Sequence, residues 1–323
     1  MRWRGHDILA FATHVHNRAA DRFRHEAVLY RGLDDLNKMV LPFVREGLAF
    51  GEPVMVAMPP DRIRVLEEAM GADSARVTFI DMLTIGANPA RIIPEWRRFV
   101  DQAQGRPSRG VGEPVWAGRR DVEIDECALH ESLLNVAFDD GPAWRLMCPY
   151  DVDALPAHAV EEALRTHPQV ASSGGGCGVD YQGHEHAFTA FTEPLSEAPS
   201  EADVLAFGLH DLSGLRGVVR RLSTQAGVGD DASEDLVLAT HELATNSICH
   251  GGGQGLLRLW TVPGAFVVEV RDSGVIIDPL VGRELSSVLS ETGRGVWMAN
   301  QLCDLVQVRS TPAGTAVRLY AWI

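Results

Sequence analysis

The segment 233–250 constrains this chain most, because apolar residues at helical spacing run beside a column of polar side chains. The apolar residues are Leu236, Val237, Ala239, Leu243, Ala244 and Ile248, and a run of glycines follows at 251–253. This pattern predicts a helix that Asp231 or Ser233 caps and the glycines end. Glu242, Asn246 and His250 are four residues apart, so a helix places them on one face. We interpret that face as a candidate site, with His250 as a helix-end histidine that meets the helix dipole.

Three short motifs follow this predicted helix. Val267–Val270 has the composition of a buried strand, and it leads into Asp272 and Gly274, where a glycine admits a close approach of backbone or ligand. Gly293–Gly295 opens a second helical pattern, and the free amides of a helix N-terminus suit an anion. Gly314–Thr315 precedes a closing strand. Each motif alone is typical of a solvated helix face, a turn or a loop, so the argument depends on their order.

The order of these motifs resembles that of a known superfamily. The sequence reads Glu242-x-x-x-Asn246, Asp272-x-Gly274, Gly293-x-Gly295 and Gly314-Thr315, which resembles the N, G1, G2 and G3 boxes of the GHKL ATPases. The short gap between Gly274 and Gly293, the His-Gly-Gly after the N box and the Gly-Arg-Gly before a helix resemble the bacterial anti-sigma factor serine kinases. The resemblance covers residues 204–323 and implies an α/β sandwich that binds ATP and Mg²⁺.

The resemblance implies a role for each polar residue of the base-binding end. Asn246 would coordinate the Mg²⁺ that bridges the nucleotide phosphates, and Asp272 would accept a hydrogen bond from the adenine amino group. Gly274 would allow close approach of the base, and Thr315 would lie near Asp272 and the adenine.

The resemblance also implies roles for the residues that would lie near the nucleotide phosphates. Gly293, Arg294 and Gly295 would form a shortened lid and a turn that contacts phosphate. Glu242 would be the catalytic base, because a carboxylate one helical turn from the metal ligand can orient or deprotonate the attacking hydroxyl.

Composition excludes several other classes of function. The 323 residues are enough for two domains, and a net charge of -15 argues against direct binding to nucleic acid or an anionic membrane. Lys38 is the only lysine and follows no glycine, so a P-loop is excluded. The five cysteines, Cys127, Cys148, Cys177, Cys249 and Cys303, are scattered and odd in number, which favours a reducing cytosol and a cytoplasmic protein. No apolar run approaches the length of a membrane span.

The N-terminal half alternates strand and helix patterns, which predicts a parallel sheet covered on both faces, a three-layer α/β domain. The expected strands are 27–30, 53–58, 76–80, 111–116 and 144–148. This half resembles the MEDS domain, a sensory module distantly similar to RecA-like folds. The resemblance rests on Tyr30–Leu36, Glu46-Gly47-Leu48, Gly112-Glu113-Pro114, Glu131 and Leu134-Asn135. We expect a MEDS-like domain over 1–192 with a leading tail at 1–20, a flexible linker at 193–202 rich in Pro, Ser and Glu, and the ATPase domain over 203–323.

A sensory domain implies a small-molecule signal, which the sequence does not identify. Open parallel sheets bind ligands at the carboxyl ends of their strands, so the candidates by position are Tyr30, Asp81, Glu113, Trp116, Arg119 and Tyr150-Asp151. Glu113 needs a partner, either a ligand or a structural hydrogen bond to the next helix. The pairs His14/His16 and His184/His186 lack further ligands and are interpreted as exposed loop histidines, not metal sites.

Three functions are compatible with the C-terminal motifs. The first is a serine/threonine kinase that binds a sigma factor and phosphorylates an anti-anti-sigma protein of the STAS class, and for this family a homodimer is implied. The second is a switch that binds ATP and partners without transferring phosphate. The third, a histidine kinase, is disfavoured because a strand and one helix precede the motif helix, instead of a dimerising helical pair.

Overall fold

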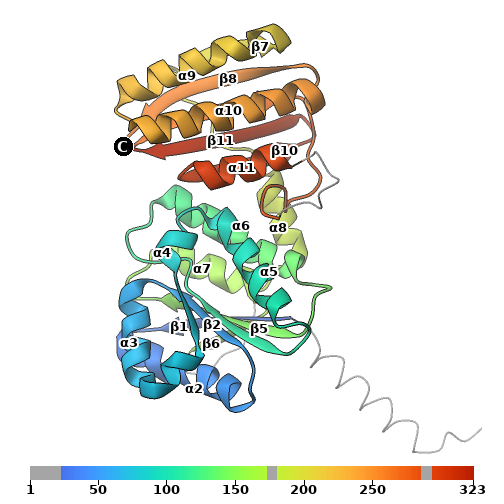
Figure 1. The fold of residues 1–323 in the computed structure, drawn as a ribbon. Helices are drawn as coiled ribbons and strands as arrows, with labels where there is room; N and C mark the ends of the chain where they lie inside the picture. The colour runs from blue at the N-terminus through green and yellow to red at the C-terminus, as the bar shows by residue number, and fades with distance from the viewer. Residues whose placement is uncertain (1–22, 173–179, 285–292) are drawn as a thin grey trace, which may run out of the picture. The chain divides into compact units, whose positions relative to one another are not determined.

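The computed structural model describes residues 23–172, 180–284 and 293–323. Contacts divide the chain into two compact units, each with its own β-sheet (Figure 1). The first unit comprises the described residues up to Thr84, Glu95–Arg119 and Leu134–His184, and the second comprises Ile85–Pro94, Arg120–Leu133 and Glu185–Ile323. The leading tail predicted at 1–20, the pair His14/His16 and Cys177 lie outside the described residues.

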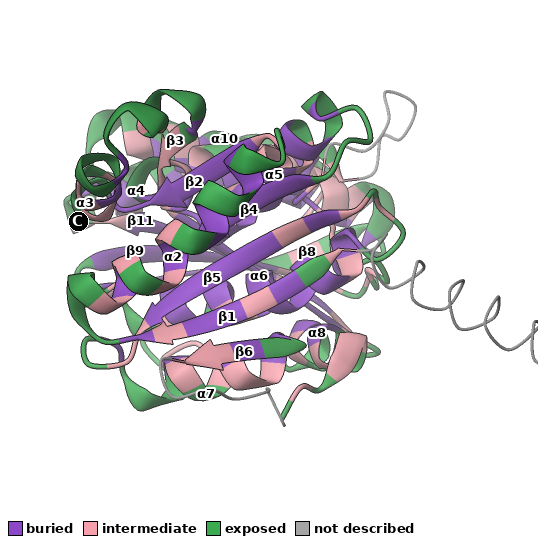
Figure 2. Cartoon of the chain, turned by 90° about the horizontal axis from the view of Figure 1, so that it is seen from below, coloured by how far each residue is buried: buried purple, intermediate pink, exposed green. Residues whose placement is uncertain are grey.

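The first sheet has six parallel strands in the order β3-β2-β4-β5-β1-β6, which confirms the predicted parallel α/β architecture. The strands are β1 (Arg24–Tyr30), β2 (Val54–Met58), β3 (Thr78–Asp81), β4 (Ser108–Gly112), β5 (Trp144–Asp151) and β6 (Gln169–Ser172). Every residue of β2 and β4 is buried, and Figure 2 shows the central strands buried along most of their length. Continuous burial is expected of a parallel sheet with helices on both faces.

Helices cover the two faces of this sheet. Leu36 and Val40 of α2 (Gly32–Ala49), and Leu66 of α3 (Pro60–Met70), join Val28 and Val56 in one apolar cluster. Trp96 of α5 (Ile92–Gln102) packs on the other face, where it leaves no room for a side chain at Gly110. The remaining helices of the N-terminal half are α4 (Met82–Ile85), α6 (Asp121–Ala137), α7 (Ala157–Thr166) and α8 (Gly183–Thr192), with short 3-10 turns at Gly71–Arg76 and Pro89–Arg91.

Proline explains where two strands differ from the sequence prediction. Strand β4 ends at Gly112 instead of continuing to 116, because Pro114 has no amide to donate and Glu113 makes the last ladder bond, from its amide to Ala57 O at 3.0 Å. Strand β5 passes through Pro149 to Asp151, beyond the predicted end at 148. Pairing with β4 stops at Met147, so the proline lies where β5 has lost that neighbour and needs no donor on that side.

The second sheet has five antiparallel strands in the order β10-β11-β9-β8-β7, which confirms the predicted sandwich. The strands are β7 (Asp203–Gly208), β8 (Gln254–Val262), β9 (Ala265–Asp272), β10 (Leu305–Thr311) and β11 (Gly314–Trp322), and a 3-10 turn lies at Leu209–Asp211. Helices α9 (Leu212–Ala226), α10 (Asp230–His250) and α11 (Arg294–Leu302) lie together on one face (Figure 1).

The predicted caps of the motif helix are wrong. Helix α10 begins at Asp230 after Gly229, which offers no capping side chain. Ser233 is buried one turn inside the helix, where its hydroxyl lies 2.6 Å from Ser223 Oγ of α9. The acidic residues at the start still face the positive end of the helix dipole.

The segment predicted as a flexible linker lies against the second sheet. The Glu197 carboxylate lies 3.2 Å from Arg258 and 3.6 Å from Arg271, and Arg318 donates to Ser196 Oγ at 3.2 Å. The face of the sheet opposite the helices carries these arginines, so an acidic segment that contains serines is complementary to it in charge and hydrogen bonding. Among the described helices, none combines the length and the apolar character needed to cross a bilayer.

Candidate functional site

Helix α10 supplies the polar column that the sequence predicts. Leu243, Ala244 and Ser247 are buried on its inner side, whereas Glu242 and Asn246 are half-buried at the edge of that face. The glycine at 251 ends the helix, and its amide donates to Ser247 O at 2.9 Å. The polar column therefore lies beside the apolar stripe of α10, at the edge of the face that packs on the sheet.

Asp272 ends β9 with both carboxylate oxygens held in place. Gly274 N donates to Oδ1 at 2.8 Å, and Ser247 Oγ donates to Oδ2 at 2.6 Å. Each oxygen can still accept a further hydrogen bond through its second lone pair. The arrangement fixes a carboxylate in one orientation, which suits recognition of an amino group on a ligand.

Thr315 lies directly opposite Asp272 in the antiparallel pairing of β11 with β9. Its hydroxyl donates to Gly274 O at 2.8 Å and lies 2.9 Å from Ser310 Oγ, which accepts from Ile276 N at 2.8 Å. Because Thr315 uses its proton on Gly274, Ser310 must donate to Thr315. This chain of hydrogen bonds holds the loop after Asp272 against β10 and β11.

Two of the predicted glycines are required by close packing. A Cβ on Gly295 would lie 2.5 Å from Asn246 Nδ2 and 3.5 Å from Glu242 Cβ, so the start of α11 touches the polar column of α10. A Cβ on Gly274 would lie 2.8 Å from His250 O, where the loop after β9 meets the end of α10. Side chains at either position would push these segments apart.

The N-terminus of α11 lies at the same place. Gly293 is its N-cap, in the left-handed conformation with φ of 99°, and the exposed Arg294 is its first residue. The first amides of the helix have no partner within the helix, and the dipole adds positive potential there. With Arg294 beside them, these amides can bind an anion such as a phosphate.

A cavity of about 660 Å³ brings the predicted residues together between α10, α11 and the sheet. Asn246, Asp272, Gly274, Gly293 and Thr315 all line it. Its size falls within the range of roughly 300–1,000 Å³ that is usual for ligand sites. Apolar side chains of the two helices, of β9 and β11 and of the loop after β9 complete the wall, among them Leu243, Val270, Ile276, Val296 and Val317.

The predicted residues Arg294 and Gly295, at the start of α11, do not line this cavity, and neither does Glu242. Glu242 lies one turn from Asn246 on α10 and beside Gly295, at the phosphate end of the predicted site. A base for an incoming hydroxyl has to face the second substrate, not the nucleotide, so this position is compatible with the predicted role.

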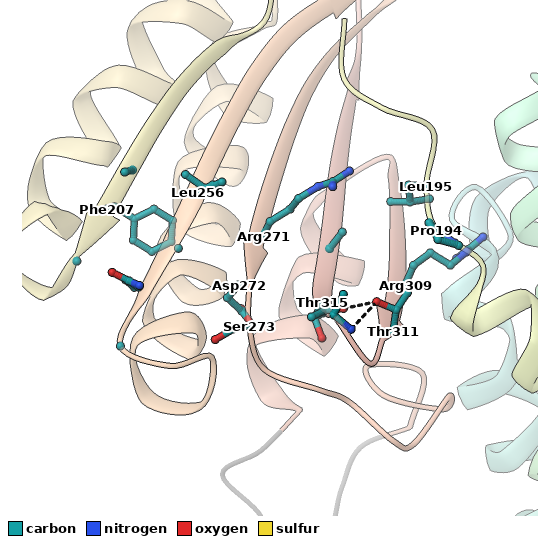
Figure 3. Close-up of a pocket in the computed structure, with 18 of the residues that line it drawn as sticks. Pro194, Leu195, Phe207, Leu256, Arg271, Asp272, Ser273, Arg309, Thr311 and Thr315 are labelled. Atoms are coloured by element: carbon teal, nitrogen blue, oxygen red, sulfur yellow. Dashed lines mark hydrogen bonds between the residues drawn. The ribbon is translucent and has the colours of Figure 1, made fainter.

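A larger hollow of about 800 Å³ lies on the opposite face of the same sheet (Figure 3). Arg271 and Leu256 point into it, across from Pro194 and Leu195, and Arg309 borders it. Asp272 and Thr315, at the strand ends, line both cavities, although strand alternation points the side chains of Arg271 and Asp272 to opposite faces. The larger hollow lacks Asn246 and the start of α11, so size alone does not identify the predicted nucleotide site.

Ser247 and Ser310 belong to the hydrogen bonds around Asp272 and Thr315 of the candidate site, and the sequence analysis missed both. Ser247 was detectable, because it is a polar residue at helical spacing on the buried stripe of α10, where an unpartnered hydroxyl is unfavourable. Ser310 gave no such signal, since it resembles any polar residue near the end of a strand.

In the first unit, the predicted carboxyl-end residues only partly come together. Tyr30 donates to Glu113 Oε1 at 2.7 Å, and Arg62 of α3, which was not predicted, lies 3.9 Å from Asp151. Asp81 instead caps α4 through Leu83 N at 2.8 Å, and the Arg119 guanidinium stacks 3.6 Å above the Trp116 ring. The partner of Glu113 is therefore a tyrosine at the end of β1, two strands away from β4, and not the next helix.

Glu113 is expected to make the protein less stable as the pH rises. Burial raises the pKa of Glu113 to about 8 from its usual 4.5, although the hydrogen bond from Tyr30 and the charge of Arg62 oppose that rise. The folded state therefore holds a proton that the unfolded state releases between about pH 4.5 and 8, and the stability that this proton provides is lost across that window.

Urea unfolding at a series of pH values measures this effect. In the Glu113→Gln variant, the decline in unfolding free energy between about pH 5 and 8 should flatten. The matched control is Glu67→Gln, at an exposed position of α3, and it should retain the decline. An unchanged slope in Glu113→Gln would assign the pH dependence to another group.

The histidine pair at 184 and 186 lies on α8, not in the predicted loop. Two residues apart on a helix point in different directions, so they do not form one metal site. The cysteines among the described residues, Cys127, Cys148, Cys249 and Cys303, are free thiols.

Comparison with known proteins identifies both halves. Residues 24–168 match the model of the MEDS family, described as the methanogen/methylotroph, DcmR sensory domain, and residues 206–321 match that of the histidine kinase-like ATPase domain. The RsbU and RsbW domains of Rv1364c from Mycobacterium tuberculosis, in a crystal structure, share 17% identity with this chain at a TM-score of 0.30. That similarity covers 39% of this chain and 33% of the mycobacterial one. No curated protein matches.

Proposed function

We propose that this chain, which joins a MEDS sensory domain to a histidine kinase-like ATPase domain, is an ATP-binding anti-sigma factor with serine/threonine kinase activity. Its substrate would be an anti-anti-sigma protein of the STAS class, and its second partner a sigma factor. The observation that carries the proposal is the meeting of Asn246, Glu242 and the start of α11 at Gly295. This contact supports the proposal, because Asn246 would bind the metal, Glu242 would be the base and the start of α11 would bind phosphate.

The residues fit ATP with Mg²⁺. The Asn246 amide offers the hard oxygen that Mg²⁺ prefers, and Mg²⁺ usually takes few protein ligands beside phosphate oxygens. When bound, the ion would neutralise charge on the transferring phosphate. The amides of α11 and Arg294 would hold the phosphates, while Asp272 and Thr315 would bind the adenine at the other end.

Glu242 would accept the proton of the attacking serine or threonine hydroxyl. In phosphoryl transfer the protein contributes mainly by positioning and by charge stabilisation, so the base has to be aligned and need not be strong. Its place beside Gly295 and outside the cavity is compatible with a hydroxyl that a separate protein substrate brings to the site. The MEDS domain would bias partner choice on binding a small molecule. We expect the protein to act in the cytoplasm, with a homodimer as the family expectation.

The deciding experiment is phosphate transfer. The purified chain is incubated with labelled Mg²⁺-ATP and the STAS-domain proteins of its own organism. The proposal expects label on a serine or threonine of one of them. Binding of ATP without transfer to any STAS protein that the chain binds would reject the kinase.

A binding switch without phosphotransfer is the second candidate. The observation that favours it is that Glu242 lies outside the cavity that Asn246 and Asp272 line. In that case ATP would only stabilise a partner-binding conformation, and sigma-factor capture would depend on ATP although no label moved.

Asn246→Ala is expected to lose the Mg²⁺ dependence of ATP binding. In the unmodified protein Mg²⁺ should tighten ATP binding, whereas the variant should bind ATP about 10–100-fold more weakly and equally with and without Mg²⁺, because the ligand oxygen is gone. Calorimetric titrations in both conditions measure this. Thr245→Ala, which removes a hydroxyl bonded only to His241 O on the same helix, is the matched control. Full Mg²⁺ dependence in Asn246→Ala would remove this residue from the metal site.

A further inference from the structure

Three side chains that commonly bind metals meet inside the MEDS-matched residues. They are His25 of β1, Cys148 of β5 and His167 directly after α7. One potential ligand atom of each lies within 4.8 Å of those of the other two. Their exposed fractions are 2%, 1% and 0%, so the cluster is closed to solvent.

The parallel pairing of β1 with β5 creates the first half of the cluster. Cys148 is the register partner of Ala27, so both point to the same face, and His25 lies two residues before Ala27 on that face. The result is a distance of 3.4 Å between Cys148 Sγ and His25 Nε2. In a tetrahedral zinc site, sulfur and nitrogen ligands are separated by about 3.5 Å, given the usual bond lengths.

Hydrogen bonds outside the cluster fix which nitrogen of His25 faces it. Asn135 Nδ2 donates to Thr166 O at 2.8 Å, which turns Asn135 Oδ1 toward His25 Nδ1 at 3.1 Å. Because Oδ1 can only accept, Nδ1 carries the proton and Nε2 offers its lone pair toward Cys148. Metal-binding histidines are oriented in this way by an acceptor on their other nitrogen.

His167 is oriented by the same principle. Its Nδ1 lies 2.9 Å from Ala163 O, a carbonyl that can only accept, so Nδ1 carries the proton and Nε2 has the lone pair. The His25 and His167 rings lie next to each other, with centroids 4.0 Å apart.

We propose that His25, Cys148 and His167 bind Zn²⁺ in a buried site of the sensory domain. Two imidazole nitrogens and a thiolate match the ligand preferences of this ion. The thiolate balances part of the charge of Zn²⁺. On binding, the Cys148 thiol gives its proton to the solvent, and shifts of at most about 1.5 Å would bring the three ligands to tetrahedral spacing.

The site would be structural. Full burial of the three side chains closes the ion to a substrate from the solvent, whereas catalytic zinc sites keep an open position. The ion would join β1 and β5 to the end of α7, and so brace the face of the sheet opposite α2 and α3. This inference does not depend on the kinase proposal.

Metal analysis of the full-length protein tests it. After purification without chelator, elemental analysis should find about one Zn²⁺ per chain. Removal with a strong chelator should lower the melting temperature by several degrees, and added Zn²⁺ should restore it. Co²⁺ in place of Zn²⁺ should give a thiolate charge-transfer band and the intense visible absorption of a tetrahedral site.

Cys148→Ser should lose both the bound zinc and the cobalt charge-transfer band. Cys303→Ser, which changes another buried thiol outside the cluster, should retain both. If Cys148→Ser does not fold, the chelator and cobalt measurements on the unmodified chain decide. Absence of bound zinc with no response to added Zn²⁺, equal zinc content in the two variants, or stoichiometric iron or copper instead would each overturn the proposal.

Discussion

Glu242→Gln is expected to reduce phosphate transfer to the protein substrate by about 10²–10⁴-fold, the usual contribution of a general base. ATP affinity should stay within about threefold, because Glu242 lies outside the cavity that the nucleotide would occupy. Glutamine keeps the size and the neighbours of the side chain, including its approach to Gly295, and removes only the ability to take a proton. Single-turnover transfer with saturating ATP measures the chemical step.

Glu234→Gln is the matched control for this experiment. Glu234 lies two turns earlier on α10, where its exposed carboxylate pairs with Arg220 of α9, and its replacement should leave transfer unchanged. Unaltered transfer in Glu242→Gln would exclude Glu242 as the base. A parallel loss of ATP affinity would instead place Glu242 among the nucleotide ligands.

Asp272→Asn is expected to weaken ATP binding by about 10–100-fold while leaving the fold intact. Gly274 N can only donate, so the asparagine oxygen should face it and the amide nitrogen should take the place of Oδ2. Ser247 tolerates the change, because its hydroxyl can donate to Leu243 O, which lies 3.1 Å away. The adenine amino group, however, would meet a donor instead of an acceptor, and an unmatched buried donor costs about 1–3 kcal/mol.

Inosine triphosphate provides the internal control, because an oxygen replaces the amino group of adenine. The unmodified protein should prefer ATP, and Asp272→Asn should lose or reverse that preference because the amide nitrogen can donate to the inosine oxygen. Urea unfolding should confirm that the variant is folded. A retained preference for ATP would show that Asp272 does not read the base.

The residues that line the candidate nucleotide site could be named from sequence because they belong to short local motifs. Asn246 and Glu242 share a helix, and Gly274 follows Asp272 by two residues, so sequence spacing alone predicted the relative positions within each pair. The pairing of Thr315 with Asp272 follows once β9 and β11 are neighbours, but the sequence did not contain that register by itself. Ser310 shows the limit, since its role arises from a hydrogen bond to Ile276 across a loop.

The parallel domain was predictable only as a pattern of elements. Its strands were found because they are short and apolar, whereas β6 was missed because it is a four-residue edge strand with two half-buried residues. The cluster of His25 and Cys148 was invisible, because more than 100 residues separate them and only the pairing of β1 with β5 brings them together. Glu113 was recognised as needing a partner, but nothing local indicated Tyr30.

The bond from Ser247 to Asp272 has a consequence for how the nucleotide is read. Ser247 follows Asn246 directly on α10, so the residue that orients the Asp272 carboxylate and the residue that would bind Mg²⁺ at the phosphates move as one body. One helix would therefore carry residues for both ends of the nucleotide, at a fixed spacing. A displacement of α10 would therefore change base recognition and phosphate binding in step, and affinity would respond to such a movement more steeply than if either end were held independently.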